Sequence, residues 1–131
     1  MPRIKELPVL FRAERSGRFR GDVTAVFPTI AADYAGREFT VYAHIGQHGG
    51  GTLPWYRDRT RAARPDEFAD LLQELRSIYE SGPDPVRLVV RHRFSAGYRQ
   101  AWQADAKAAR DLLRADPSGG PWTPSDEGES V

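Results

Sequence analysis

Polar and apolar residues alternate in three stretches of the chain, with the period of two that is typical of half-buried β-strands. The stretches are Phe19–Phe27, Glu38–Ile45 and Val86–Phe94. The turn sequence at residues 34–36 separates the first two, which are therefore predicted to pair as an antiparallel hairpin. A shorter apolar run over residues 9–13, directly after a proline, predicts a further strand at an edge of the sheet.

Two further segments have the three- and four-residue spacing of amphipathic helices. From Pro65 to Ser81 apolar side chains form one continuous stripe, and Asp66 and Glu67 suit the positive end of a helix dipole. Ser95 can cap a second helix, which has a weaker stripe. Residues 46–52 hold four glycines in seven positions, so this segment is predicted to be a loop.

Together these elements predict an α+β fold. We expect an antiparallel sheet of about four strands, with the 65–81 helix packed on one face and a C-terminal helix packed at an edge or against a partner. The second face of such a sheet is expected to be open to solvent. Residues 1–116 form the single domain of this prediction, and residues 117–131, rich in proline, glycine and acids, are expected to be a disordered acidic tail.

Composition removes several classes of function from consideration. The 131 residues include no cysteine, which excludes disulfide scaffolds, thiolate zinc sites and cysteine nucleophiles. No apolar run is long enough to span a bilayer, and the N-terminal residues do not have the pattern of a signal peptide. We therefore expect a cytoplasmic protein without membrane attachment.

Arginine dominates the basic residues. Of the 19 basic side chains 17 are arginines, and although the net charge of the chain is +1, residues 1–62 carry a net charge of +4 and the remainder −3. Arginine recognises carboxylate and phosphate groups through its planar fork. A codon bias toward arginine explains the same composition, so the arginine count alone does not assign a partner.

The predicted outward face of the sheet and the segment after the glycines hold the candidate site residues. Residues 55–57 interleave aromatic and arginine side chains, a composition that stacks on bases and binds phosphates. Alternation in the last predicted strand places its arginines outward and His92 toward the core. The predicted binding surface consists of Tyr42, His44, His48, Trp55, Tyr56, Arg57, Arg87, Arg91 and Arg93.

The two histidines of this surface carry the remaining candidate chemistry. A hairpin that is symmetric about Asp33 places Asp22 opposite His44 and Thr24 opposite Tyr42. A carboxylate beside an imidazole can orient a general base or hold a metal, and it can equally form an ordinary cross-strand ion pair. The chain has no nucleophile elbow and no His-Glu-x-x-His motif, so we assign no catalytic residue and no metal ligand.

The glycine-rich segment also raises the question of a phosphate-binding loop. It lacks the Gly-Lys-Ser/Thr ending and the dinucleotide-binding spacing, and the next predicted helix begins many residues later. No cofactor is therefore expected.

Four segments carry a resemblance to other proteins: Thr24–Pro28, Tyr42–His48, Trp55-Tyr56 and Glu67–Leu75. With these segments the chain resembles, over residues 9–94, small hypothetical proteins of bacterial, phage and mobile-element genomes. The resemblance implies no activity and no residue roles. It implies an accessory interaction protein, such as one that binds a host component.

We therefore expect a small, non-catalytic binding protein that contacts a protein partner through its exposed sheet face and the loop at residues 46–61. A nucleic-acid-binding module is the first alternative, because arginines and aromatic residues are interleaved. A small enzyme or metal site that uses His44 and His48 is the second. The sequence leaves the strand order and the oligomeric state open.

Overall fold

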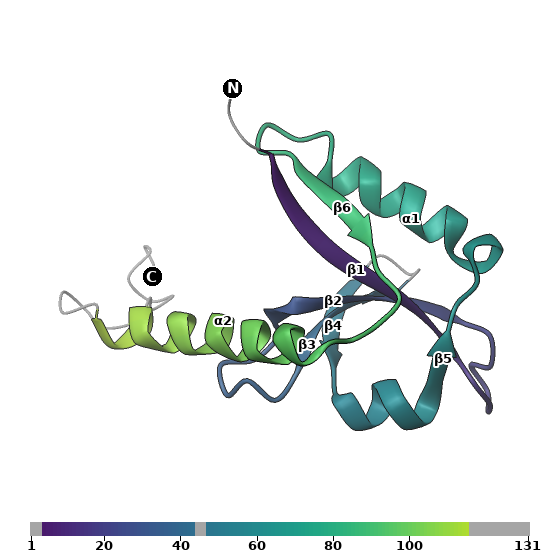
Figure 1. The fold of residues 1–131 in the computed structure, drawn as a ribbon, viewed down its shortest axis with the longest axis horizontal. Helices are drawn as coiled ribbons and strands as arrows, with labels where there is room; N and C mark the ends of the chain where they lie inside the picture. Colours follow the sequence, from purple (N-terminus) through teal and green to yellow (C-terminus); the bar gives the residue numbers. More distant parts are fainter. Residues whose placement is uncertain (1–3, 44–46, 116–131) are drawn as a thin grey trace, which may run out of the picture.

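The longest strand of the sheet organises the fold. The structure is a computed structural model that describes residues 4–43 and 47–115, and these residues form a sheet of six strands with helices on both sides (Figure 1). The elements, in chain order, are β1 (Lys5–Glu14), β2 (Val23–Ala31), β3 (Phe39–Ala43), β4 (Gln47–Gly51), the π-helical turn η1 (Trp55–Arg59), β5 (Thr60–Ala62), α1 (Pro65–Tyr79), β6 (Val86–Val90) and α2 (Ala96–Ala115).

The predicted α+β class is confirmed, with more strands than the four expected. The main path of the sheet is β4-β3-β2-β1-β5, in which all neighbours are antiparallel, and β6 pairs with β1 in parallel. One edge of β1 pairs with two strands, β6 and β5. Just beyond β6 the Val9 carbonyl accepts from the Arg91 amide at 2.8 Å, and just beyond β5 the Phe11 carbonyl accepts from the Ala63 amide at 2.9 Å. The first strand is therefore a central strand and not the predicted edge strand.

The glycine-rich segment is a strand, so the predicted loop at residues 46–52 is wrong for its described part. In β4, Gly49 lies opposite Val41 and Gly51 lies opposite Phe39. A Cβ atom at Gly51 would lie 2.9 Å from side-chain atoms of both Phe39 and Val41, so a larger residue does not fit there. Glycine is present because the side chains of β3 lean across β4.

The β2–β3 hairpin has a register one residue away from the predicted one. Tyr42 pairs with Ala25 and not with Thr24, and a bulge between Phe27 and Ala31 shifts the register again. A shift of one residue moves every side chain of a strand to the other face of its sheet. Tyr42 therefore shares the face of Ala25 and Phe27, contrary to the predicted outward orientation.

Both faces of the sheet are covered, which corrects the expectation of an open second face. In Figure 1 β1 passes between α1 and α2. Under α1 the core contains Val9, Phe11, Phe27, Tyr42, Leu71 and Leu75. On the other face α2 and η1 enclose Leu10, Val26, Phe39, Tyr56 and Trp102.

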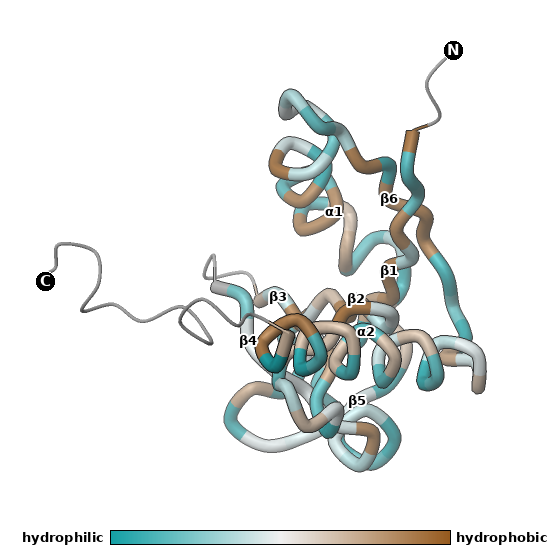
Figure 2. Tube along the Cα trace, turned by 90° about the vertical axis from the view of Figure 1, so that its left-hand side faces the viewer, coloured by the Kyte–Doolittle hydropathy of each residue, from teal (hydrophilic) through white to brown (hydrophobic). Residues whose placement is uncertain are grey.

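Each of the two helices buries one of its sides. In Figure 2 both α1 and α2 carry hydrophobic (brown) as well as hydrophilic (teal) positions along their length. Helix α1 confirms the predicted helix and buries Phe68, Leu71 and Leu75. Helix α2 does not sit at an edge: it packs on β2, and Trp102 donates its indole N–H to the Gly36 carbonyl at 3.0 Å.

The end of the chain differs from the prediction in one place and lies outside the description in another. Because β6 ends at Val90, alternation does not continue through the following residues, and His92 is exposed instead of core-facing. The predicted tail, residues 117–131, lies outside the described residues. Neither α1 nor α2 is long and apolar enough to cross a membrane.

Candidate functional site

The predicted binding surface is divided between the two faces of the sheet. Tyr42 is 3% exposed under α1, and Tyr56 is 7% exposed on the opposite face. His44 lies outside the described residues. Arg87 extends from β6 and pairs with Glu6. The expectation that these residues share one exposed face is therefore wrong, because both faces of the sheet are covered and the register places Tyr42 in the core.

A polar group on the α1 face connects the helix to β3 and β4. The Tyr42 hydroxyl donates to Glu74, and the Tyr79 hydroxyl lies 2.8 Å from His48 Nε2. The rings of Tyr42 and His48 meet edge to face, with centroids 4.8 Å apart. The hydrogen bond to Glu74 and burial raise the pKa of Tyr42, and burial raises the pKa of Tyr79.

Because both tyrosines keep their protons at neutral pH, this group positions elements and does not supply a phenolate. Within residues 4–43 and 47–115, no three His, Asp or Glu side chains are grouped so that they could hold a metal ion. Asp22 lies in the turn before β2, where its carbonyl accepts from the Glu14 amide at 3.0 Å. The hypothesis that His44 and His48 form one site stays a prediction.

On the opposite side of the molecule, aromatic contacts join η1 to the segment between β6 and α2. The Phe94 ring meets the Tyr56 ring edge-on at 5.1 Å and the Tyr98 ring at 6.1 Å. Four exposed arginines lie within three positions of these aromatic residues along the chain. We call this set the arginine surface, which consists of Arg57, Arg91, Arg93 and Arg99.

The side chains of the arginine surface are free to bind. Among the described residues, none of the four forms an ion pair or a side-chain hydrogen bond. Arg12 lies beneath this surface, with its guanidinium 4.0 Å from the centroid of the Tyr56 ring and within 3.1 Å of the Tyr56 carbonyl. Burial lowers the pKa of Arg12, whose role is to hold η1 in place.

The sequence identified three members of this surface and missed Arg99. Alternation along a strand suggested Arg91 and Arg93, although both follow the end of β6. Arg99 belongs to the first turn of α2 and is counted in the set because its neighbour Tyr98 packs on Phe94. A contact of that kind leaves no local signal in the sequence.

A cleft of about 660 Å³ lies among the β1–β2 turn, η1 and α1. Its apolar lining includes Phe19, Val23, Trp55 and Leu71, which come from these separate elements. Its carboxylates are Glu14, Asp22, Glu67 and Asp70, and Arg59 lines it as well.

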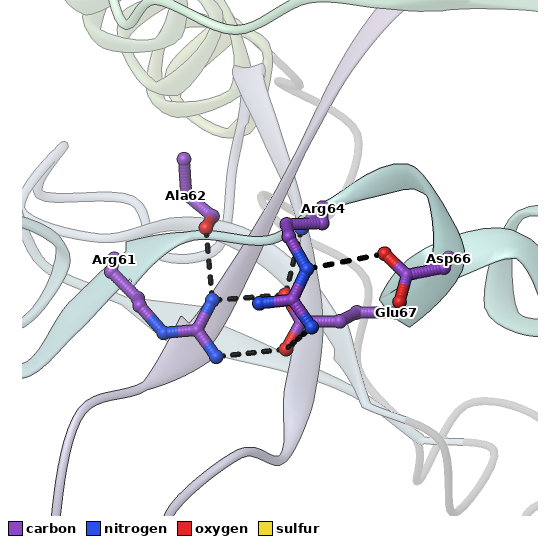
Figure 3. A network of polar contacts seen from close by, with 5 residues as sticks. All are labelled: Arg61, Ala62, Arg64, Asp66 and Glu67. Carbon is purple, nitrogen blue, oxygen red and sulfur yellow. Dashed lines mark hydrogen bonds and ion pairs between the residues drawn. The ribbon is translucent and has the colours of Figure 1, made fainter.

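Two of these carboxylates are held by internal partners. Arg61 binds Glu67 through two hydrogen bonds of 2.9 and 2.8 Å, and the Arg64 amide adds a third at 2.8 Å (Figure 3). These contacts lower the pKa of Glu67 to about 2. Glu14 accepts the indole N–H of Trp55 at 3.0 Å.

Asp22 and Asp70 differ from the other two acids. Neither forms a side-chain hydrogen bond or an ion pair within the described part of the chain. The sequence indicated Asp22 as a possible partner of His44. It gave no signal for Asp70, because an exposed acidic residue is common on the polar face of an amphipathic helix. The cleft therefore combines apolar walls with two free carboxylates.

Comparisons of the chain with protein-family models, curated proteins and solved structures found no match. The function is therefore inferred from the chemistry of the arginine surface and of the cleft.

Proposed function

We propose that this protein is a small, non-catalytic binding protein whose arginine surface docks on an acidic patch of a partner protein. The observation that carries the proposal is a set of four exposed arginines without acidic partners among the described residues, on segments that the contacts of Phe94 with Tyr56 and Tyr98 hold together. Guanidinium groups match carboxylates through paired hydrogen bonds, and such pairs provide orientation as well as affinity.

The packing beneath the arginine surface supports this function. Phe94 contacts Phe39 at 5.3 Å and Trp102 at 5.9 Å, so the segment that carries Arg91 and Arg93 is fixed to the core. A fixed backbone lowers the entropy that binding must overcome. Within residues 4–43 and 47–115, these four arginines have no ion pair that must be broken first, in contrast to Arg61, which already binds Glu67.

The charge balance favours an acidic protein over nucleic acid. The whole chain has a net charge of only +1 and a pI near 8.1. Asp58 is exposed in the same π-helical turn as Arg57. Proteins that bind nucleic acid usually present an extended basic surface, because most of their affinity comes from several phosphate contacts. We also propose a cytoplasmic location, which cell fractionation tests.

The test compares two polyanions of equal charge. A labelled ten-residue poly-glutamate peptide and a single-stranded oligonucleotide with ten phosphates are titrated with the protein, and fluorescence anisotropy is measured. We expect tighter binding of the peptide. The variant Arg91→Glu/Arg93→Glu should weaken that binding by at least about tenfold, because charged anchors carry much of the energy of such interfaces.

The matched control is Arg37→Glu/Arg114→Glu, which changes the net charge equally at exposed positions away from the arginine surface. It should retain most of the affinity for the peptide. An equal loss of affinity in both variants would mean that net charge alone explains the effect, and this result would overturn the proposal. Tighter binding of the oligonucleotide would mean that the partner is a nucleic acid and not an acidic protein, and would overturn the proposal as well.

A further inference from the structure

The cleft among the β1–β2 turn, η1 and α1 is separate from the arginine surface in composition and charge. Its volume of about 660 Å³ falls within the range of small-molecule sites, which is about 300–1,000 Å³. None of the four arginines that define the arginine surface lines it.

The apolar wall of the cleft can hold a flat or aliphatic body. Trp55 is half-buried, and its indole N–H is bound to Glu14, which fixes the ring. Phe19 is 59% exposed at the turn between β1 and β2, an unusual exposure for a large aromatic ring. A ligand that covers Phe19 removes this apolar surface from water, which favours binding.

The charges of the cleft define the sign of the ligand. Arg61 and Arg64 neutralise Glu67, and Trp55 occupies one carboxylate oxygen of Glu14. Asp22 and Asp70 have no partner among the described residues for their carboxylate oxygens, and Arg59 is a basic residue in the lining. Carboxylates outnumber basic groups in the lining, so the site attracts cations and repels anions.

We infer that this cleft binds a small organic cation with one amine or guanidinium group on an apolar body. The cationic group is held by Asp22 and Asp70, and the body lies against Phe19 and Trp55. A charge-assisted hydrogen bond to a free carboxylate is stronger than a neutral one, and aromatic faces also attract cations. The cleft thus adds a small-molecule site to a protein whose proposed partner binds elsewhere.

The experiment uses tryptamine as the probe and indole-3-propionate as its matched anion. Binding of each compound to the full chain is measured by isothermal titration calorimetry at low salt. Tryptamine should bind, and indole-3-propionate, which has the same ring with the opposite charge, should bind at least tenfold more weakly. Butylamine, which has the same single positive charge and no aromatic ring, measures the share of affinity that comes from charge alone.

Variants locate the site. Asp22→Asn/Asp70→Asn should weaken tryptamine binding at least tenfold, whereas Asp58→Asn/Asp84→Asn removes two exposed carboxylates outside the cleft and should leave it unchanged. Phe19→Ala changes an exposed residue and should weaken the binding of tryptamine more than that of butylamine. Thermal melting establishes that each variant is folded.

Three results would overturn the inference: no binding of tryptamine, equal binding of its anionic analogue, or full affinity in the Asp22→Asn/Asp70→Asn variant. These outcomes are independent of the poly-glutamate titration, since the two experiments change different residues. Failure of one proposal therefore leaves the other standing.

Discussion

Gly51 allows the edge strand β4 to lie close against β3. Added Cβ atoms meet very different surroundings along this strand: at Gly51 two side-chain atoms would lie 2.9 Å away, whereas at Gly49 the nearest atom, from Val41, would lie 3.8 Å away. The second distance is an ordinary contact. Two glycines that are two residues apart on β4 therefore differ in what they tolerate, and the difference comes from the side chains of the neighbouring strand.

We predict that Gly51→Ala destabilises the protein by about 1–3 kcal/mol, because the methyl group forces Phe39 and Val41 out of place. Gly49→Ala, the matched control, should be neutral or stabilising by up to about 1 kcal/mol, since alanine reduces the entropy of the unfolded chain. Urea unfolding at pH 7 measures both. Equal effects at the two positions would show that β4 is not held tightly against β3.

Glu67 connects the start of α1 to β5. Its carboxylate accepts from Arg61 and from the Arg64 amide, which completes a capping box at the first turn of the helix. The pKa of Glu67 falls from 4.5 to about 2 as a result. A lowered pKa in the folded state means that the ionised carboxylate stabilises folding, and that this contribution is present above the unfolded-state pKa.

Stability of the Glu67→Gln variant should therefore converge with that of the natural chain as pH falls. The difference in free energy of unfolding should be fully present at pH 7, decrease below pH 4.5 and disappear near pH 2. Chemical denaturation across this range measures it, with Asp58→Asn as a control that removes an exposed carboxylate for which the described part of the chain offers no partner. A difference that stays constant with pH would contradict the role of the ionised carboxylate.

At the scale of elements, α1 shows how a sequence stripe becomes a buried face. Leu75 is completely buried in the core beneath the helix, whereas Ile78, which belongs to the same predicted stripe, is 48% exposed. The stripe is wider than the contact, because in the last turn of α1 Tyr79 packs against Phe27 of β2 whereas Ile78 lies outside the core. Sequence periodicity gives the direction of the face, and the partner element determines how much of it is buried.

Leu75→Ala should cost about 2–5 kcal/mol through lost burial and a residual cavity. Ile78→Ala, on the same helix, should cost less than about 1 kcal/mol, since most surface substitutions have small effects. Denaturant midpoints of the two variants provide the comparison. Similar losses would mean that the last turn of α1 packs as tightly as its centre.

At the scale of the whole molecule, the sheet separates two cores. Phe11 and Phe68 stack at 4.3 Å on the α1 side, whereas Phe39 meets Trp102 edge-on at 5.2 Å on the α2 side. Each helix is thus required to close one of the two cores. The arginine surface borders the second core, and the cleft opens where η1 and α1 approach the β1–β2 turn.

We predict that Trp102→Ala destabilises the protein by about 3–5 kcal/mol, since it empties the centre of the second core and removes the hydrogen bond to Gly36. Leu112→Ala, on the same helix at a position 74% exposed, should have little effect. Thermal unfolding followed by circular dichroism measures both. A small effect of Trp102→Ala on stability would contradict the packing of α2 on the second core and would favour the edge position expected from the sequence.

The sequence by itself determined the elements whose signals are local. The stripe of α1, the alternation within β2 and β3, and the capping of α2 depend on neighbours within a few residues, and each of these elements forms. The sequence also showed that residues 55–57 combine aromatic and arginine side chains, but it did not show that Tyr56 is buried.

The tertiary structure alone decided the register, the second covered face and the composition of both sites. A shift of one residue buries Tyr42, and the contact of Tyr98 with Phe94 adds Arg99 to the arginine surface. Asp22 and Asp70 line one cleft although they are far apart in the sequence. Such contacts depend on how separately stable elements pack together, and a local pattern of polar and apolar residues does not encode which surfaces meet.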